Sequence, residues 1–453
     1  MSEFKVGFSR VNINPTLGIG IQGYYKPRFA RGILDDIYAN AIAYELGDTR
    51  IVQIAVDNCG ITAVQCREFA EYADDLTGIG ADNVFISSTH THTAPFTKPT
   101  EAFPCPDEPI LAYAQFLKER VGDAAVMALA DLKPAKMGFC VGWAPERVAY
   151  IRRYKMKDGS TWTCPPINDP NIDYPIGELD QRVNVLRFDR EGGDTIVLMN
   201  YGLHADTLNL DLISPDWPGW MSRTFETAVP GTRVVFVAGA AGDVGSTHVH
   251  PEGGDMNDTL ISFDNEMKSP GMCRFVGRAL AGTILQVYDK VEYVDVDEIK
   301  ILHDIVKTPA NTATKEQLET AKKYVKLHEE GKDDEIPFAA MELTTVVAEA
   351  LRMVRLENGE DHFDLPITGL KLGPVAMLGI PGEPFTGVGV GIKKAEGWKC
   401  ILPCYLAGGS EGYFPMKEAF DEGGYEARTS SFKGGVAESL IEKGKELLDK
   451  LRK

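Results

Sequence analysis

Short apolar runs rich in β-branched residues recur along this chain and alternate with longer segments of helical periodicity. Residues 41–46 and 51–56 are two such runs, separated by Gly47-Asp48, and they predict a pair of neighbouring strands. A helix is expected over 64–75, and a buried strand over 84–88 follows it. This alternation is typical of an α/β protein, but alone it does not distinguish a single unit from two α/β domains.

The same pattern continues through the rest of the chain. Further strands are expected at 137–141, 185–188, 195–201 and 234–238, and twice within 363–378. Further helices are expected at 111–132, 270–289, 314–330, 337–354 and 432–451. The polar, proline-containing stretch 155–180 is predicted to be a long loop.

The length of the chain bears on its domain organisation. Its 453 residues exceed the roughly 250–300 at which single cores stop growing, so two packed layers or two lobes are expected. No internal repeat and no convincing linker divides the sequence, so residues 1–453 are treated as one domain.

Charge and hydropathy limit the partners of this protein. The net charge is −19, and no cluster of Lys and Arg is long enough to follow a phosphate backbone, which argues against nucleic acid. The same charge would be repelled by an anionic membrane surface, although Arg152, Arg153 and Lys155 offer a local basic pocket for an anionic substrate.

No apolar stretch of about 18 residues and no signal-peptide pattern is present, so a cytoplasmic location is expected. Eight cysteines are too few for a disulfide scaffold. Cys400 and Cys404, the closest pair, are expected to be buried thiols, because no second pair completes a four-cysteine zinc site.

Two of the eight histidines stand directly after the strand predicted at 84–88, in the segment His90-Thr-His92. Residues two apart on an extended backbone project to the same side, so both imidazoles can enter one pocket. The carboxyl end of a strand is also where open α/β sheets place their ligands. Polar residues that merely begin a loop would look the same.

His204 follows the strand predicted at 195–201, and Glu383 lies at the start of a predicted helix. Either residue alone is more typical of a structural, hydrogen-bonded position. Together with His90 they supply two imidazoles and a carboxylate, the ligand set of many catalytic zinc sites that leave a position for water. The same set can also hold Mn²⁺ or Fe²⁺.

At this point the sequence resembles the catalytic domain of the neutral ceramidases and their smaller bacterial relatives. The resemblance covers nearly the whole chain, and its most specific motif is Ser88-Thr-His-Thr-His-Thr-Ala-Pro. The other matching segments, in chain order, are Val6-Gly-Phe-Ser-Arg-Val-Asn-Ile-Asn-Pro, Gly32-Ile-Leu-Asp-Asp-Ile-Tyr-Ala, His204 with Leu212-Ile-Ser, Gly242-Asp-Val, Pro381-Gly-Glu, and Tyr413 with Tyr425-Glu-Ala.

The resemblance implies a fold and a metal site. The fold would be two mixed β-sheets packed together with helices outside, a four-layer α/β/β/α arrangement. The ligands of a zinc ion would be His90, His204, Glu383 and Tyr413. Tyrosine is an unusual ligand that no spacing would nominate, but a phenol beside a dication loses its proton more easily.

The resemblance also implies roles around the metal. His92 and Asp243 are the candidates for stabilising the oxyanion and managing the proton of the leaving amine during amide hydrolysis by metal-activated water. Tyr425 would hold the substrate's carbonyl oxygen. Arg152 would line the pocket, unless it belongs to a solvated basic loop.

The sequence departs from the family at one functional position. Gly245 stands where the ceramidase motif has a serine after Gly-Asp-Val, so substrate contacts are expected to differ, and Gly245 is counted with Trp217 among the substrate-binding candidates. The chain also lacks the features that long-chain ceramide hydrolysis would favour. A small soluble amide, lactam, ester or lactone is therefore expected, in a pocket that Trp217, Trp220 and Tyr174 help to shape.

Other interpretations stay open at this stage. The same metal site can serve an isomerase or a lyase, with His92 or Asp243 as the base. The chain can also be a metal-binding or ligand-binding protein that has no activity. The presence of Gly245 in place of the family's serine favours this interpretation. His248 and His250 either form a second site or belong to a surface loop, and homo-oligomerisation is left open.

Overall fold

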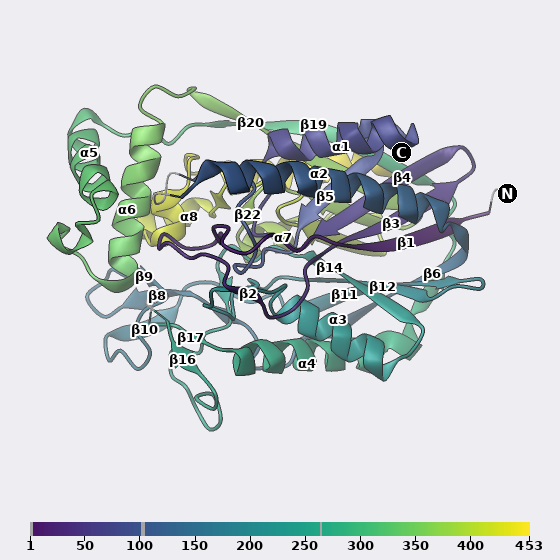
Figure 1. The fold of residues 1–453 in the computed structure, drawn as a ribbon, viewed down its shortest axis with the longest axis horizontal. Coiled ribbons are helices and arrows are strands. Elements are labelled where there is room, and N and C mark those ends of the chain that lie inside the picture. The colour runs from purple at the N-terminus through teal and green to yellow at the C-terminus, as the bar shows by residue number, and fades with distance from the viewer. Residues whose placement is uncertain (1–2, 101–104, 263–264) are drawn as a thin grey trace.

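The computed structural model describes residues 3–100, 105–262 and 265–453 (Figure 1). The expected first pair of strands is present as β3 (Tyr38–Leu46) and β4 (Thr49–Val56), which pair antiparallel from Leu46 opposite Thr49. Gly47 in the connecting turn has φ +60°, a conformation that glycine adopts without a steric penalty. This hairpin begins the larger of two sheets.

The large sheet has nine strands among the described residues, in the order β14-β12-β11-β6-β1-β3-β4-β5, with β18 paired to β6. Most neighbours are antiparallel, but β12 pairs with β14 and β4 with β5 in parallel, so the sheet is mixed. The bounds of the other strands are β1 (Lys5–Asn12), β5 (Val84–Ser88), β6 (Lys133–Trp143), β11 (Arg182–Arg190), β12 (Thr195–Tyr201), β14 (Thr232–Ala238) and β18 (Glu292–Val294).

The second sheet is also mixed, with the order β19-β20-β21-β23. Its last pair, β21 and β23, is parallel and the others are antiparallel. The bounds are β19 (Ile299–Pro309), β20 (His362–Leu372), β21 (Val375–Gly379) and β23 (Cys400–Cys404). Cys400 and Cys404, at the two ends of β23, are buried free thiols, as expected.

The two sheets pack on each other through one apolar cluster. It joins Ile42 and Tyr44 of β3, with their equivalents on neighbouring strands, to Leu370, Met377 and Leu402 of the small sheet. The intervening residues of β3 face the other way, against helices α1 (Ala63–Thr77) and α2 (Asp107–Ala130). Alternation of side chains along a strand allows one sheet to bury both of its faces.

Further helices cover the remaining faces. Helices α3 (Trp217–Ala228) and α4 (Pro270–Val287) pack on the half of the large sheet that contains β11, β12 and β14, and they run along the lower side of Figure 1. Helices α7 (Thr386–Ile392) and α10 (Val436–Arg452) cover the small sheet. The predicted α/β class with two mixed sheets is confirmed. None of the described helices is both long and apolar enough to cross a membrane.

A helical hairpin interrupts the small sheet between β19 and β20. Its helices, α5 (Lys315–Glu329) and α6 (Ala340–Arg355), stand at the left end of the molecule in Figure 1. Thr314 and Gln317 form a capping box that starts α5. Salt bridges from Arg428 to Glu342 and Glu349, each 2.6 Å long, tie α6 to the rest of the chain.

One expectation about local structure was wrong, and one helix was missed. The stretch 155–180 is only partly a loop, because β8 (Arg153–Met156), β9 (Thr161–Thr163) and β10 (Ile172–Pro175) form a small sheet there. These strands are short and one pairing is irregular, so no clear alternation marks them. Helix α3 was also not expected, although Asp216 caps its first residue and proline stands in its first turn.

The contact between the two sheets should dominate stability. Leu370 is fully buried within it, so Leu370→Ala should lower the free energy of unfolding by about 2–5 kcal/mol through lost transfer energy and a residual cavity. Denaturant titration followed by circular dichroism measures the change. Leu111→Ala, at a position 55% exposed on α2, is the matched control and should change stability by less than about 1 kcal/mol.

A buried carboxyl at the end of β4 should make stability depend on pH. Burial raises the pKa of Asp57 to about 7, although its hydrogen bonds with the Tyr38 amide and the Thr89 hydroxyl oppose the shift. The folded state therefore holds this proton more firmly than the unfolded state. The stability from this group is fully present below about pH 4 and is lost as pH rises through about 7.

The variant Asp57→Asn should accordingly flatten the pH dependence of unfolding between pH 4 and 8. Its stability at any single pH is not the relevant quantity, because the amide also alters two hydrogen bonds. Denaturant midpoints measured at several pH values give the slope. An unchanged slope in the variant would show that Asp57 ionises normally in the folded protein.

Candidate metal centre

His90 lies two residues beyond the carboxyl end of β5, an edge strand of the large sheet. Its φ is +67°, a left-handed conformation that costs a residue with a side chain about 1–2 kcal/mol. Its backbone amide donates to the carbonyl of Asn58, which follows β4, over 2.9 Å. Non-glycine residues held in this conformation cluster at functional sites, where surrounding contacts maintain them.

Two more buried side chains meet His90. His204 lies three residues after β12, and Glu383 begins β22 (Glu383–Pro384). The Oε2 atom of Glu383 is 3.2 Å from His90 Nε2 and 3.1 Å from His204 Nε2. Ligands about 2.0–2.1 Å from one tetrahedral metal ion lie roughly 3.3 Å from each other, so this spacing suits a shared cation.

The hydrogen bonds of the imidazoles prepare them for a metal. His90 Nδ1 donates to the carbonyl of Cys59 over 2.6 Å, and His204 Nδ1 donates to the carbonyl of Ala241 over 2.9 Å. In the neutral form of each ring, Nε2 is therefore left with a lone pair, in the arrangement typical of metal-bound histidines. His204 Nε2 and Glu383 Oε2 are buried and make no hydrogen bond with the described residues. The donor set thus fits a cation.

The directions in which the pKa values of His204, Glu383 and His90 are shifted also agree with a cation site. Burial and Arg152 lower the pKa of His204 to about 4, so its imidazole is neutral. Burial alone would raise the pKa of Glu383, but the adjacent His90 and His204 outweigh it and hold that pKa well below the usual range. Burial likewise opposes protonation of His90, yet Glu383 raises its pKa. A metal ion at this point would displace that proton.

Tyr413, on β24 (Tyr413–Phe414), lies directly beside Glu383, because β22 and β24 pair in parallel. Its hydroxyl accepts a hydrogen bond from Arg152 over 3.1 Å. The Arg152 guanidinium also donates to Glu426 over 2.7 Å. The ring of Tyr425 meets that of Tyr413 edge-on, 5.6 Å between centroids. Arg152, Tyr413 and Tyr425 therefore all belong to this centre.

His92 points its Nε2 atom at His90 Nε2, 3.2 Å away. Its other nitrogen, Nδ1, is 3.6 Å from a carboxylate oxygen of Asp206, and Asp206 is held in turn by the Tyr24 hydroxyl at 2.5 Å and by Lys268 at 2.6 Å. Gly23, at φ +120°, packs so closely that a Cβ there would lie 2.8 Å from the His92 ring. Burial, together with His90 and His204, holds the pKa of His92 well below its usual value.

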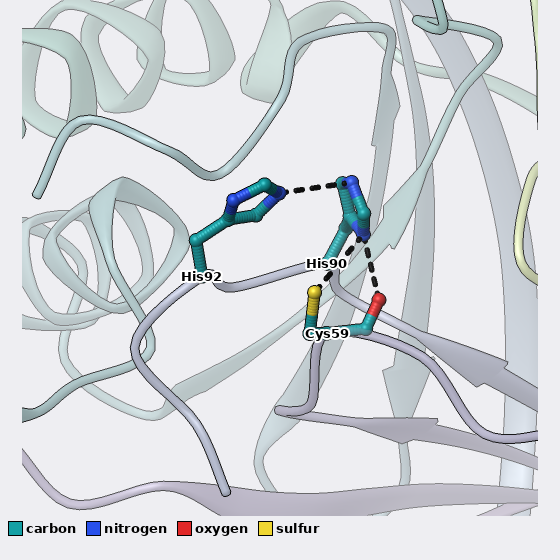
Figure 2. A group of neighbouring side chains, drawn as sticks. All are labelled: Cys59, His90 and His92. Carbon is teal, nitrogen blue, oxygen red and sulfur yellow. Dashed lines mark hydrogen bonds between the residues drawn. The ribbon is translucent and has the colours of Figure 1, made fainter. Parts of the chain in front are cut away.

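Cys59 is a member of the centre that the sequence did not indicate. Its carbonyl oxygen and its thiol both face His90, with Sγ 3.9 Å from Nδ1, as Figure 2 shows. Cys59, His90 and His92 form a second group whose donor atoms lie within 4.8 Å of one another. Tyr405 was also missed; its fully buried ring packs edge-on against His90, 5.3 Å between centroids. Neither residue belongs to a recognisable local motif.

Three predicted site residues lie outside the cavity. Asp243 is buried and accepts from the amide and hydroxyl of Thr386, at 2.7 and 2.9 Å, at the start of α7. Trp217 is completely buried, and its indole N–H donates to the carbonyl of His204 over 2.9 Å. Gly245 pairs with Tyr150, and a Cβ on it would make only ordinary contact with Arg152. The expectation that Trp217 touches substrate does not fit this position.

The remaining candidates are placed elsewhere. His248 stacks on Tyr150, 4.8 Å between ring centroids, and lies 3.0 Å from Asp255 beside a different cavity. His250 is exposed on the same segment. Neither histidine joins a metal-binding group among the described residues. Arg153 is buried and pairs with Glu422, and Lys155 does not line the cavity, so Arg152 alone of the three expected basic residues lies in its wall.

The centre opens into a cavity of about 350 Å³. Its walls include His90, His92, Arg152, Glu383, Tyr413 and Tyr425. Helix α6 contributes a further wall through Met341, Thr344 and Arg355. This volume is at the lower end of the range for small-molecule sites.

This protein is similar to known proteins in its structure. No protein-family model and no curated protein matches the sequence. The neutral ceramidase from Pseudomonas aeruginosa superimposes with a TM-score of 0.73 at 17% identity, over 100% of this chain and 75% of that chain. A ceramidase complexed with C2 gives 0.72 at 17% identity, over 100% and 76%. The chain therefore has the neutral ceramidase fold.

Proposed function

We propose that this protein is a zinc-dependent hydrolase that cleaves a non-peptide amide or a related carbonyl bond of a small substrate. The observation that carries the proposal is that His90 Nε2 and His204 Nε2 both lie within about 3.2 Å of Glu383 Oε2, with both imidazoles oriented by backbone carbonyls. The fold shared with ceramidases, which are hydrolases of an amide bond, supports the reaction class.

His90, His204 and Glu383 would hold the metal, with Tyr413 as the fourth ligand. When bound, zinc supplies Lewis acidity toward a carbonyl group and toward a water molecule. Burial and Glu383 raise the pKa of Tyr413 well above its usual value, and the hydrogen bond from Arg152 opposes that rise. A bound cation would favour the anionic form of the phenol. The nitrogen and oxygen donors favour zinc but would also accept Mn²⁺ or Fe²⁺.

His92 is placed to handle the proton of the reaction. Its neutral imidazole faces the metal ligands through Nε2, and Asp206 lies near Nδ1 to stabilise positive charge on the ring. His92 can therefore accept a proton from the attacking water and then pass it to the departing amine. The Tyr425 hydroxyl and the Arg152 guanidinium, both in the cavity wall, would bind the substrate's carbonyl oxygen.

The other predicted residues receive supporting roles in this proposal. Asp243 fixes the start of α7 next to the β22 strand that carries Glu383, and Trp217 holds the backbone of His204. Gly245 lies beside the stem of Arg152, where an added Cβ would make only ordinary contact. A cytoplasmic location and homo-oligomerisation stay predictions.

Removal of one metal ligand should abolish binding of the ion. The protein should contain about one zinc per chain, and His204→Ala should lose it, because a catalytic site with three strong protein ligands does not keep its affinity with two. Metal analysis of the purified protein by mass spectrometry measures the content. His248→Ala is the matched control and should leave it unchanged. Full zinc content in His204→Ala would refute this ligand set.

His92→Ala should separate metal binding from turnover. Zinc content should be retained, while kcat should fall by about 10²–10⁴-fold, the usual contribution of a positioned acid or base. Release of primary amine from a panel of small amides gives the rate. Unaltered kcat would assign His92 a structural role.

An isomerase or lyase on the same metal site is the second candidate function. It shares every group named above, so only the fate of water distinguishes it from a hydrolase. Turnover in water enriched in ¹⁸O should place the label in the acid product. Unlabelled product would favour the isomerase or lyase, and retained zinc without turnover on any substrate would favour a binding protein.

A further inference from the structure

We infer that the substrate is a small amide that carries a carboxylate, and that Arg355 on α6 binds this carboxylate at the mouth of the cavity. The inference rests on the proposed function, because it names the substrate of the same site. Nothing in the ligand set or in the catalytic groups requires it. It follows from the size of the cavity, from its lining and from the pairing of its charges.

The lining is unsuited to long hydrocarbon chains. Apart from tyrosines and cysteines, Phe96 and Met341 are the two large apolar side chains that line this cavity of about 350 Å³ in the described part of the chain. Gln22 also lines it, and its buried Oε1 accepts no hydrogen bond from any described residue. A buried acceptor without a partner is costly, and an N–H group of a bound amide would satisfy it.

Most charges of the cavity wall are neutralised within the protein. The exceptions among the described residues are the Glu411 carboxylate, which accepts a hydrogen bond from the Ala63 amide over 3.2 Å, and the Arg355 guanidinium. Arg152 pairs with Glu426, and Asp206 and Glu266 both pair with Lys268. Arg355 is exposed, and its Nη2 donates to the Ser431 hydroxyl over 2.8 Å. Among the described residues no carboxylate lies within 4.0 Å of its guanidinium.

An unpaired guanidinium is unusual in a chain with 66 acidic and 47 basic residues. Most of the N–H donors of Arg355 remain available beside the hydroxyl groups of Thr344, Thr429 and Ser431, which line the same cavity. A planar guanidinium with free donors matches the geometry of a carboxylate, which it binds through two parallel hydrogen bonds.

Arg355 also lies at a suitable place relative to the metal centre. Arg355, Tyr25 and Tyr425 line the same cavity, and the partly buried Tyr25 interacts through its hydroxyl with that of Tyr425. Tyr425 in turn contacts Tyr413 beside Glu383. Two tyrosines, Tyr25 and Tyr425, thus lie between the guanidinium and Tyr413, the proposed fourth ligand, so a small molecule can contact both ends. The net charge of −19 would repel an anion, which makes this local cation necessary for its capture.

Matched pairs of probes test the inference. One arm uses N-acetyl amino acids, which carry the carboxylate on the amine side, each with the alcohol in which CH₂OH replaces the carboxylate. The other arm uses N-alkyl succinamates, which carry it on the acyl side, each with the matching alcohol. KM and kcat come from release of primary amine by the zinc-loaded protein, and calorimetry measures binding independently of turnover.

The acid of at least one pair should have the lower KM in the wild-type protein. Arg355→Gln should raise that KM by about ten-fold, because a hydrogen bond to a charged group is lost, and should leave kcat and the KM of the alcohol nearly unchanged. Arg355→Lys keeps the charge but not the planar fork, so its KM for the acid should lie between those of the wild-type protein and Arg355→Gln. Arg67→Gln, an exposed arginine on α1 outside the cavity wall, controls for the change in net charge.

Two results would overturn the inference: equal affinity of the wild-type protein for acids and alcohols, or an unchanged acid preference in Arg355→Gln. Absence of binding by every acid of both arms would overturn it as well. Failure of the proposed function looks different. Carboxylate binding that depends on Arg355, with bound zinc but no hydrolysis of any pair, would leave the inference standing and would contradict the hydrolase.

Discussion

The burial of the Glu383 carboxylate between two imidazoles is the constraint on which the rest of this structure depends. A charge removed from water costs several kcal/mol unless opposite charge or hydrogen bonds compensate for it. Here the two Nε2 atoms lie 3.1 and 3.2 Å from one carboxylate oxygen. Such an assembly of electron-pair donors is favourable only with a proton or a cation among them, and its geometry suits a cation.

The surrounding chain serves to keep these donors in place. The carbonyls of Cys59 and Ala241 set the tautomers of the two histidines, Trp217 holds the backbone of His204, and the parallel pairing of β22 with β24 places Tyr413 beside Glu383. The left-handed backbone of His90 is held by the hydrogen bond from its amide to the Asn58 carbonyl. The two packed sheets supply the rigidity, because each contributes strand ends to the centre.

The substrate side of the site is built differently from the metal side. It includes the rim of a helical hairpin inserted into the small sheet and a polar wall that contains Gln22, Tyr24 and Asp206. The ceramidases share the fold of the whole chain at 17% identity, a level at which side chains that contact substrate are free to differ. The size and polarity of this cavity argue for a substrate much smaller than a lipid with two hydrocarbon chains.

By itself the sequence determined the strands and helices with clear periodicity, and it singled out His90, His92, His204 and Glu383 because each stands where a regular element ends or begins. Tertiary structure alone decided that Cys59, Asp206, Tyr24 and Tyr405 belong to the same centre and that Asp243 and Trp217 support it from outside. The physical reason is that periodicity and turn chemistry are local, whereas strand order and sheet packing determine which distant residues meet. Arg355 was hidden for the same reason, since a charge on a helix reveals its lack of a partner only in the folded protein.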